Sequence, residues 1–231
     1  MATEVSSPEA VPRFSLAQEA YAAIRTMIIA GEVPPGSRIT VRPIVERLGL
    51  SATPVKAALM TLEREGVIES KLHRGFFVPE LQEDDMREIY EMRGALDRLA
   101  GQLAASSPNH VTIAAELRAN CEVQRRYLET GDVDGYRRID IEFHHNLWAL
   151  CGNSRLQRTG EQLMDQMRLG NSLSARLPGR VALSLTEHLV IVEAIEHGQV
   201  ERAGAAAAQH IVSVRNTFMD SVADAQNLPA E

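Results

Sequence analysis

A long run of helical periodicity, from Asp84 to the end of the chain, limits the choice of fold more than any other property of the sequence. Apolar residues recur there at three- and four-residue steps, and no segment shows the alternation of a strand. Turn-forming residues interrupt the pattern, which predicts helices at about 84–105, 109–130, 132–151, 154–176, 181–197 and 199–223. The sequence therefore predicts an all-α bundle for this part of the chain.

The residues before this run follow a different pattern. Apolar spacing predicts three shorter helices, at about 15–30, 42–48 and 51–65. The last two are separated by a four-residue turn that contains Gly49, and such a pair forms a helix-turn-helix. A strand over 66–71, a turn at 73–75 and a returning strand over 76–78 predict a β-hairpin wing.

The predicted fold class is mostly α: a winged helix-turn-helix with a small β-hairpin wing, followed by an all-α helical bundle. The expected boundaries are a disordered tail at 1–12, a DNA-binding domain at 13–79, a linker at 80–84, a helical domain at 85–223 and a tail at 224–231.

Charge does not exclude nucleic acid, although the chain carries a net charge of −7. Residues 37–75 contain seven Arg or Lys side chains and four acidic ones. Phosphates respond to this local field rather than to the net charge. The first turns of the second helix in the helix-turn-helix would reach base edges, so Ser51, Thr53 and Lys56 are candidate DNA contacts. For Ser51 and Thr53, a role limited to capping that helix remains an alternative.

The sequence has no apolar run near the ~20 residues of a membrane span, and its polar start lacks the pattern of a signal peptide. We therefore expect a cytoplasmic protein with no membrane partner. The two cysteines, Cys121 and Cys151, lie in no CxxC motif, and we expect them to be thiols in a helical core.

Four residues of the helical region could bind a metal ion. Asp140 and His144 are four positions apart on one predicted helix and therefore share a face. His188 and His210 lie among apolar residues on two later helices. Buried imidazoles need partners, and these could be hydrogen bonds within the core or one shared divalent ion. Spacing alone leaves both interpretations open.

The N-terminal region resembles the GntR family of winged-helix regulators over about residues 15–79. The motifs that carry the resemblance are Pro35-Gly36-Ser37-Arg38, Leu48-Gly49-Leu50-Ser51, Thr53-Pro54-Val55, Ala58-Leu59, Leu62, Glu65-Gly66 and Arg74-Gly75. The resemblance implies DNA contacts by Arg42 and by a wing tip of His73, Arg74 and Gly75 in or along the minor groove. Ala52 and Lys56 replace two arginines that the family usually has, so we expect an unusual operator, because Ala52 cannot read guanine.

The rest of the chain resembles the FCD ligand-binding domain of FadR-type GntR regulators over about residues 82–222. The matching residues are Arg138, Asp140, Phe143, His144, Gly152, Asn153 and Leu156. The resemblance implies that Asp140, His144, His188 and His210 bind a divalent metal ion: zinc first, with nickel, copper or iron also suited to imidazole. Six helices indicate the VanR-like branch. Arg93 stands where such domains carry an arginine for an effector carboxylate, although an ordinary exposed or interdomain arginine remains an alternative.

These features together predict a sequence-specific transcription regulator rather than an enzyme. A homodimer would bind a pseudo-palindromic operator in double-stranded DNA. A small organic acid bound at the metal would control operator affinity, in the usual sense as relief of repression. One alternative is a regulator that responds to the metal ion itself, and a remote one is a metal-dependent hydrolase.

Overall fold

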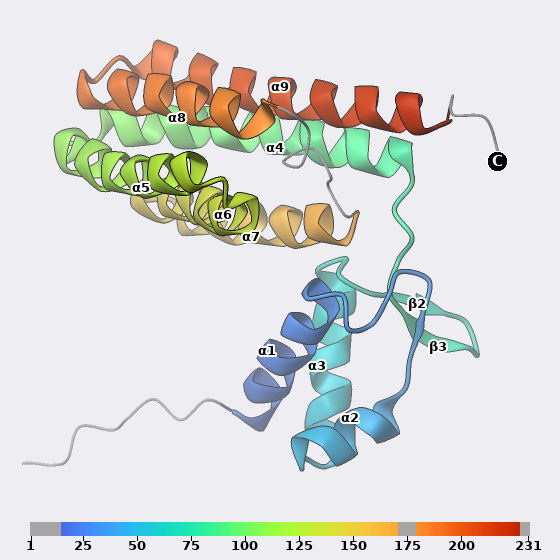
Figure 1. Ribbon diagram of the computed structural model, residues 1–231. Coiled ribbons are helices and arrows are strands. Elements are labelled where there is room, and N and C mark those ends of the chain that lie inside the picture. The colour runs from blue at the N-terminus through green and yellow to red at the C-terminus, as the bar shows by residue number, and fades with distance from the viewer. Residues whose placement is uncertain (1–14, 171–178, 227–231) are drawn as a thin grey trace, which may run out of the picture. The chain divides into compact units, whose positions relative to one another are not determined.

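The computed structural model describes residues 15–170 and 179–226, and the chain divides after Glu80 into two compact units (Figure 1). The predicted N-terminal tail at 1–12 and the last five residues of the predicted C-terminal tail lie outside the described residues. In the described part of the chain, no helix is long and apolar enough to cross a membrane.

The first unit is built around three helices: α1 (Leu16–Ile29), α2 (Val41–Leu48) and α3 (Ala52–Arg64). A reciprocal pair of side-chain to backbone hydrogen bonds between Ser15 and Gln18 begins α1. Gly49 ends α2 at φ 65°, a conformation that glycine adopts without strain, and so lets the chain turn directly into α3. The helix-turn-helix predicted from the sequence is thus present.

A three-stranded antiparallel sheet completes this unit, in the order β1 (Arg38–Ile39), β3 (Gly75–Phe77), β2 (Glu69–Lys71). Arg38 of β1 and Glu69 of β2 both face Phe77, from opposite sides. The prediction of a simple hairpin was therefore incomplete, because a two-residue strand is too short to show alternation. β2 also begins three residues later than expected, after a turn at Gly66 with φ 71°.

The second unit contains six helices within its described residues, as predicted. They are α4 (Glu83–Ser106), α5 (His110–Thr130), α6 (Val133–Leu150), α7 (Ser154–Leu169), α8 (Arg180–Glu196) and α9 (Val200–Gln226). The sequence predicted that the fourth of these helices, α7, would reach about residue 176. Residues 171–176 of that prediction lie outside the described residues. α9 continues three residues into the expected C-terminal tail.

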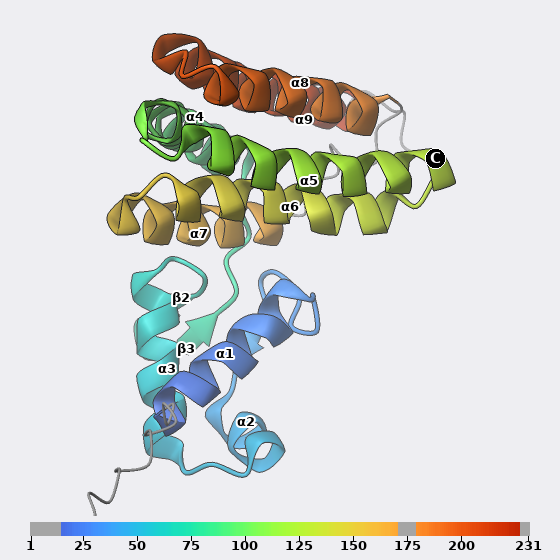
Figure 2. The ribbon, with the colours of Figure 1, turned by 90° about the vertical axis from the view of Figure 1, so that its left-hand side faces the viewer.

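The six helices form a closed ring in which α4 contacts α9, and the sequence of neighbours continues through α8, α5, α6 and α7 back to α4. Figures 1 and 2 show these helices running along a common direction. α4 and α9 approach closely at Gly101, where an added Cβ would lie 2.7 Å from the carbonyl oxygen of Ala203. Because the helices close into a ring, side chains from several of them face the same interior, as a site with ligands from different helices requires.

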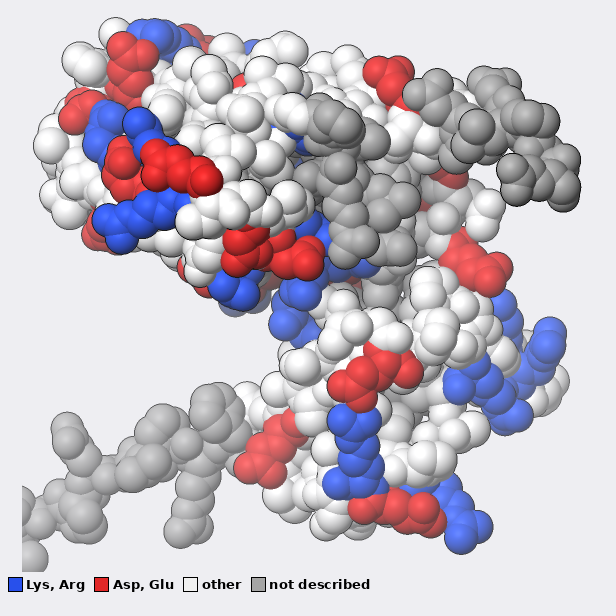
Figure 3. Space-filling view, viewed as in Figure 1, with Lys and Arg blue, Asp and Glu red and all other residues white. Residues whose placement is uncertain are grey.

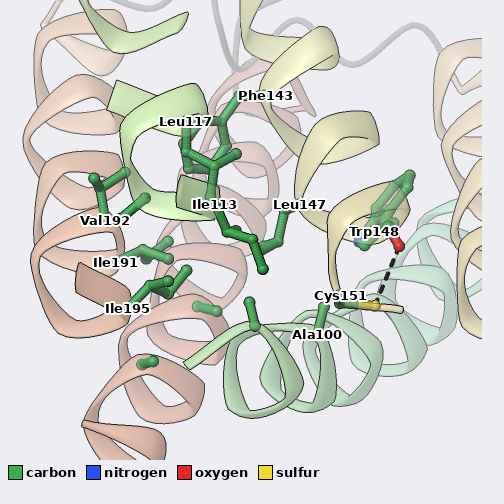
Figure 4. Close-up of a cluster of buried hydrophobic side chains, with 14 of the residues drawn as sticks. Ala100, Ile113, Leu117, Phe143, Leu147, Trp148, Cys151, Ile191, Val192 and Ile195 are labelled. Carbon is green, nitrogen blue, oxygen red and sulfur yellow. Dashed lines mark hydrogen bonds between the residues drawn. The ribbon is translucent and has the colours of Figure 1, made fainter. Parts of the chain in front are cut away.

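An apolar core fills one part of this ring (Figure 4). Phe143, Leu147 and Trp148 of α6 are completely buried and pack with residues of α5 and α8. Cys121 and Cys151 are buried free thiols, which confirms their predicted role, and the Cys151 thiol donates to the carbonyl of Trp148. The polar groups described next lie beside this apolar packing.

Candidate functional site

Three histidines from three helices meet inside the second unit. His144 of α6, His188 of α8 and His210 of α9 are 4%, 0% and 2% exposed. The Nε2 atom of His210 lies 3.3 Å from that of His188 and 3.3 Å from that of His144. Nitrogen ligands about 2.0–2.1 Å from a zinc ion are about 3.0–3.4 Å apart, so this spacing suits a shared ion.

Partners on the other side of the rings fix where the protons are. Nδ1 of His210 donates to the Glu187 carboxylate at 2.8 Å. Nδ1 of His188 donates to Oε1, the side-chain amide oxygen of Gln124, at 3.0 Å. A neutral imidazole carries one proton, so the Nε2 atom of each ring presents a lone pair. Metal-binding histidines show the same arrangement, in which an outer acceptor orients the ring.

His144 has a carboxylate as its outer neighbour. Its Nδ1 lies 3.3 Å from Oδ2 of Asp97, at an angle that makes no hydrogen bond. The other oxygen of Asp97 accepts from the indole of Trp148 at 2.7 Å and from Nε of Arg93 at 3.3 Å. Burial opposes ionisation of Asp97, but Arg93 and His144 outweigh it and lower the pKa of this carboxyl. An ionised Asp97 therefore lies beside the His144 ring.

Burial also favours the neutral form of two of the imidazoles, those of His144 and His188. It lowers the pKa of His144 to about 4 and the pKa of His188 well below its ordinary value. Burial alone would raise the pKa of Glu187, but hydrogen bonds from His210 and Arg180 lower it to about 2. The Nε2 atoms of the three rings face one another, an arrangement that a cation among them would stabilise.

Asp140, the fourth predicted ligand, lies at the edge of this cluster. Its Oδ1 is 3.8 Å from Nε2 of His188, and its side chain is 26% exposed. It shares one face of α6 with His144, as the four-residue spacing predicted. The structure therefore brings three of the predicted ligands together and places the fourth beside them, and coordination by Asp140 stays a prediction.

Arg93 is buried, 1% exposed, so the interpretation of an ordinary exposed arginine was wrong. Its guanidinium lies 4.6 Å from the centre of the Trp148 ring, and Nη1 is 3.2 Å from the sulfur of Met167. Among the described residues, Nη2 has no hydrogen-bond partner. A buried guanidinium nitrogen without a partner is costly, which makes this atom a candidate for an anionic ligand. Effector binding by Arg93 stays a prediction.

The outer partners of the histidines were missed from the sequence. The side-chain oxygen Oε1 of Gln124 also accepts from the Tyr136 hydroxyl at 3.1 Å. The side-chain nitrogen Nε2 of Gln124 donates to Oδ1 of Asn120 at 2.8 Å. Arg180 donates to Glu187 at 2.7 Å and to Ser213 at 2.9 Å. The available signal was Asn120 and Gln124, two amides four residues apart on the otherwise apolar buried face of α5.

The first unit presents the predicted recognition helix. Val55, Ala58, Leu59 and Leu62 form the buried face of α3, while Ser51, Thr53 and Lys56 are exposed. Ser51 stands at the N-cap, but its side chain makes no capping hydrogen bond, so a role limited to capping was wrong for this residue. The first turn of α3 therefore keeps N–H groups that this side chain does not cap, and a helix N-terminus of this kind can bind a phosphate.

The wing carries basic groups on an aromatic support. Lys71 Nζ and the Arg74 guanidinium lie 4.9 and 5.8 Å from the Phe77 ring centre. Arg38 of β1, which we did not assign a role, lies within reach of Gly75. Figure 3 shows Lys and Arg side chains gathered over this sheet.

His73 and Gly75 form the tight tip of this wing, with φ of 59° and 92°. Arg42, in α2, is exposed and forms an ion pair with Glu46 at 2.8 Å. DNA contact by these residues stays a prediction.

A winged helix-turn-helix joined in one chain to a helical bundle with a buried polar cluster defines a class of protein, the DNA-binding regulator with a separate sensing domain. Comparison with known proteins gives the family. Residues 16–78 match the bacterial regulatory proteins of the gntR family, and residues 88–213 match the FCD domain. The chain belongs to the GntR family of transcriptional regulators, whose members bind DNA, and carries an FCD domain.

Relatives of known description are transcription regulators rather than enzymes. A probable D-xylose utilization operon transcriptional repressor of Paenarthrobacter nicotinovorans is 32% identical over 187 residues, 80% of this chain and 81% of its own length. The Nta operon transcriptional regulator of Aminobacter aminovorans is 28% identical, over 71% of this chain and 78% of its own. The solved structure of E. coli McbR/YncC shares the fold, with a TM-score of 0.74 at 22% identity over 91% of this chain and all of that one.

Proposed function

We propose that this regulator is a repressor that binds its operator as a homodimer, and that a small organic acid bound at a metal ion in the FCD domain controls its operator affinity. The observation that carries the proposal is the convergence of the Nε2 atoms of His144, His188 and His210, with hydrogen-bond acceptors behind the last two rings and the Asp97 carboxylate beside the first. A core that needed only apolar packing would not gather three buried ring nitrogens at one point.

The donor set indicates the kind of metal. Three imidazoles, with the carboxylate of Asp140 close by, suit zinc first and nickel, copper or iron next. With three protein ligands, such an ion keeps a fourth position open for a ligand from outside. A carboxylate is a suitable ligand for that place, because it binds a divalent ion through oxygen.

The buried Arg93 supports an organic acid as that ligand. Its Nη2 has no partner among the described residues, and its Nε contacts Asp97, the outer neighbour of His144. An acid that binds the metal would thus meet a second positive charge within the same interior. This arrangement favours an acid over a neutral molecule, because guanidinium and carboxylate form strong charge-assisted hydrogen bonds.

In the DNA-binding unit, the exposed face of α3 and the basic wing would occupy adjacent grooves of one half-site. Effector binding can change operator affinity only if it favours one arrangement of the protein over another. Coupling of this kind is typically about 5–150-fold in affinity.

The first experiment measures metal content in His210→Ala, with His197→Ala as the matched control. His197 is exposed at the C-cap of α8, where its Nδ1 lies 2.8 Å from the Glu193 carbonyl oxygen of the same helix. After dialysis against zinc, elemental analysis should find about one ion per chain in the parent and in His197→Ala, and much less in His210→Ala. Full retention by His210→Ala would remove it from the ligand set.

Genomic DNA selection with the zinc-loaded protein then tests the regulatory role. A short inverted repeat upstream of a few operons is expected, and the encoded enzymes would indicate which acids to add. Release of the repeat by such an acid at constant zinc supports the proposal. If operator affinity instead follows the zinc concentration with no organic acid present, the metal ion itself is the signal.

A further inference from the structure

The exposed face of the recognition helix α3 carries very little charge. Residues 51–62 contain one charged side chain, Lys56. Farthest from the buried face of the helix are Thr53, Ala57 and Met60, which follow one another at four- and three-residue steps and so share one side. All three are exposed, and Met60 is 57% exposed. We call these three residues the α3 stripe.

The other basic residue of α3, Arg64, is folded back along its own helix. Its Nε donates to the Met60 carbonyl oxygen at 3.3 Å, and its Nη2 donates to the Thr61 hydroxyl at 3.1 Å. Bidentate recognition of guanine O6 and N7 needs a guanidinium directed at the base. Residues 51–62 contain no arginine, so this part of α3 offers no such group.

The α3 stripe presents methyl groups to whatever it meets: the γ-methyl of Thr53, the β-methyl of Ala57 and the thioether methyl of Met60. Base pairs present one apolar group in the major groove, the C5-methyl of thymine, and alanine and threonine methyls are suited to contact it. A helical side chain covers the turn before its own Cα, so Met60 extends over the turn that carries Lys56 and Ala57. The stripe is therefore complementary to thymine.

We propose that the α3 stripe recognises thymine methyl groups in the major groove of double-stranded DNA, so that α3 selects thymine rather than guanine. The inference rests on the proposed docking of α3 in a half-site and adds which base it selects. Lys56, beside the stripe, stays available for a phosphate. Burial of one methyl group contributes about fourfold in affinity, so each recognised thymine has a measurable effect.

Removal of the thymine methyl alone tests this inference. A binding site is first selected from a random-sequence duplex library with the full-length, zinc-loaded protein. Each thymine of the selected site is then replaced, one at a time, by deoxyuridine, which lacks only the C5-methyl. At one or more thymines of each half-site, this replacement should weaken binding about fourfold in a fluorescence-anisotropy titration at constant salt. Deoxyuridine in the flanking sequence should have no effect.

Two variants connect the methyl effect with the stripe. Thr53→Ser deletes one methyl and keeps the hydroxyl, and Met60→Ala removes the thioether. Each should weaken binding to the selected site. Each should also reduce the effect of deoxyuridine to below about twofold at the thymine it contacts, because one contact cannot be lost twice. Val111→Ala on α5 is the matched control, since Val111 is also 57% exposed, and it should change nothing.

The outcomes separate this inference from the proposed function. A library without a shared site, a site at which no deoxyuridine weakens binding, or variants that keep the full deoxyuridine effect would each overturn it. Lys56→Ala on the same duplex shows which idea failed. If Lys56→Ala weakens binding but deoxyuridine does not, only the thymine readout is wrong, and if neither does, the docking of α3 is wrong as well. No organic acid is added, so the effector proposal does not affect the result. If Met60→Ala fails to fold by circular dichroism, Thr53→Ser decides alone.

Discussion

Gln124→Ala should weaken zinc binding although Gln124 touches no metal. Its carbonyl oxygen accepts from Nδ1 of His188 at 3.0 Å and so holds the ring with Nε2 toward His210. Without this acceptor, His188 can rotate or carry its proton on Nε2, where the proton would compete with the metal. Gln124 is completely buried and is held by Asn120 and Tyr136, so the orientation is rigid in the parent protein.

The size of the effect follows from what is lost. Outer-shell partners of metal ligands typically contribute 10–100-fold in affinity, or about 1.4–2.8 kcal/mol. The truncation also leaves Tyr136 and Asn120 without one partner each, which should cost the metal-free protein about 1–3 kcal/mol in the free energy of unfolding. The two losses have different readouts, so they can be separated.

Zinc affinity is measured by competition with a chelating dye, and the fold is monitored by the fluorescence of Trp148. This is the only tryptophan in the chain, and it is buried 6.1 Å from His144, ring centre to ring centre. Gln157→Ala on α7, which loses a hydrogen bond to Glu161 away from the cluster, is the matched control. A folded Gln124→Ala protein whose zinc affinity stays within threefold of the parent would refute the reasoning.

Three further predictions concern the helix contact and the DNA-binding unit. Gly101→Ala should lower the free energy of unfolding by about 1–3 kcal/mol in a thermal melt, because the added Cβ would lie 2.7 Å from the Ala203 carbonyl oxygen. The control is Gly94→Ala, whose Cβ would meet nothing closer than 3.9 Å. This variant should be neutral or stabilising in the same melt. Lys56→Ala should weaken operator binding and reduce the salt slope by about 1, and an unchanged slope in a salt titration would remove Lys56 from the phosphate contacts. Deletion of His73–Gly75 should weaken operator binding in a gel-shift assay while zinc content stays at the parent level, since the wing belongs to the first unit.

The helices were predictable because their signals are local. Apolar spacing placed all six helices of the second unit, and Gly49 with Pro54 marked the turn and start of the recognition helix. β1 was missed because two residues paired across a long sequence separation leave no periodic trace. The same reason explains why Arg38 was not connected with the wing: its position depends on pairing with Phe77, not on its neighbours in sequence.

The histidine cluster was predictable only in part. The i, i+4 pair on α6 is a local feature, but the meeting of His188 and His210 with it depends on how α6, α8 and α9 pack. The resemblance to the FCD domain supplied that information, while the residues taken singly favoured histidines that are hydrogen-bonded within a core. Gln124 and Glu187 escaped notice because an outer acceptor is defined by the ring it faces, and nothing in its own sequence context marks that role.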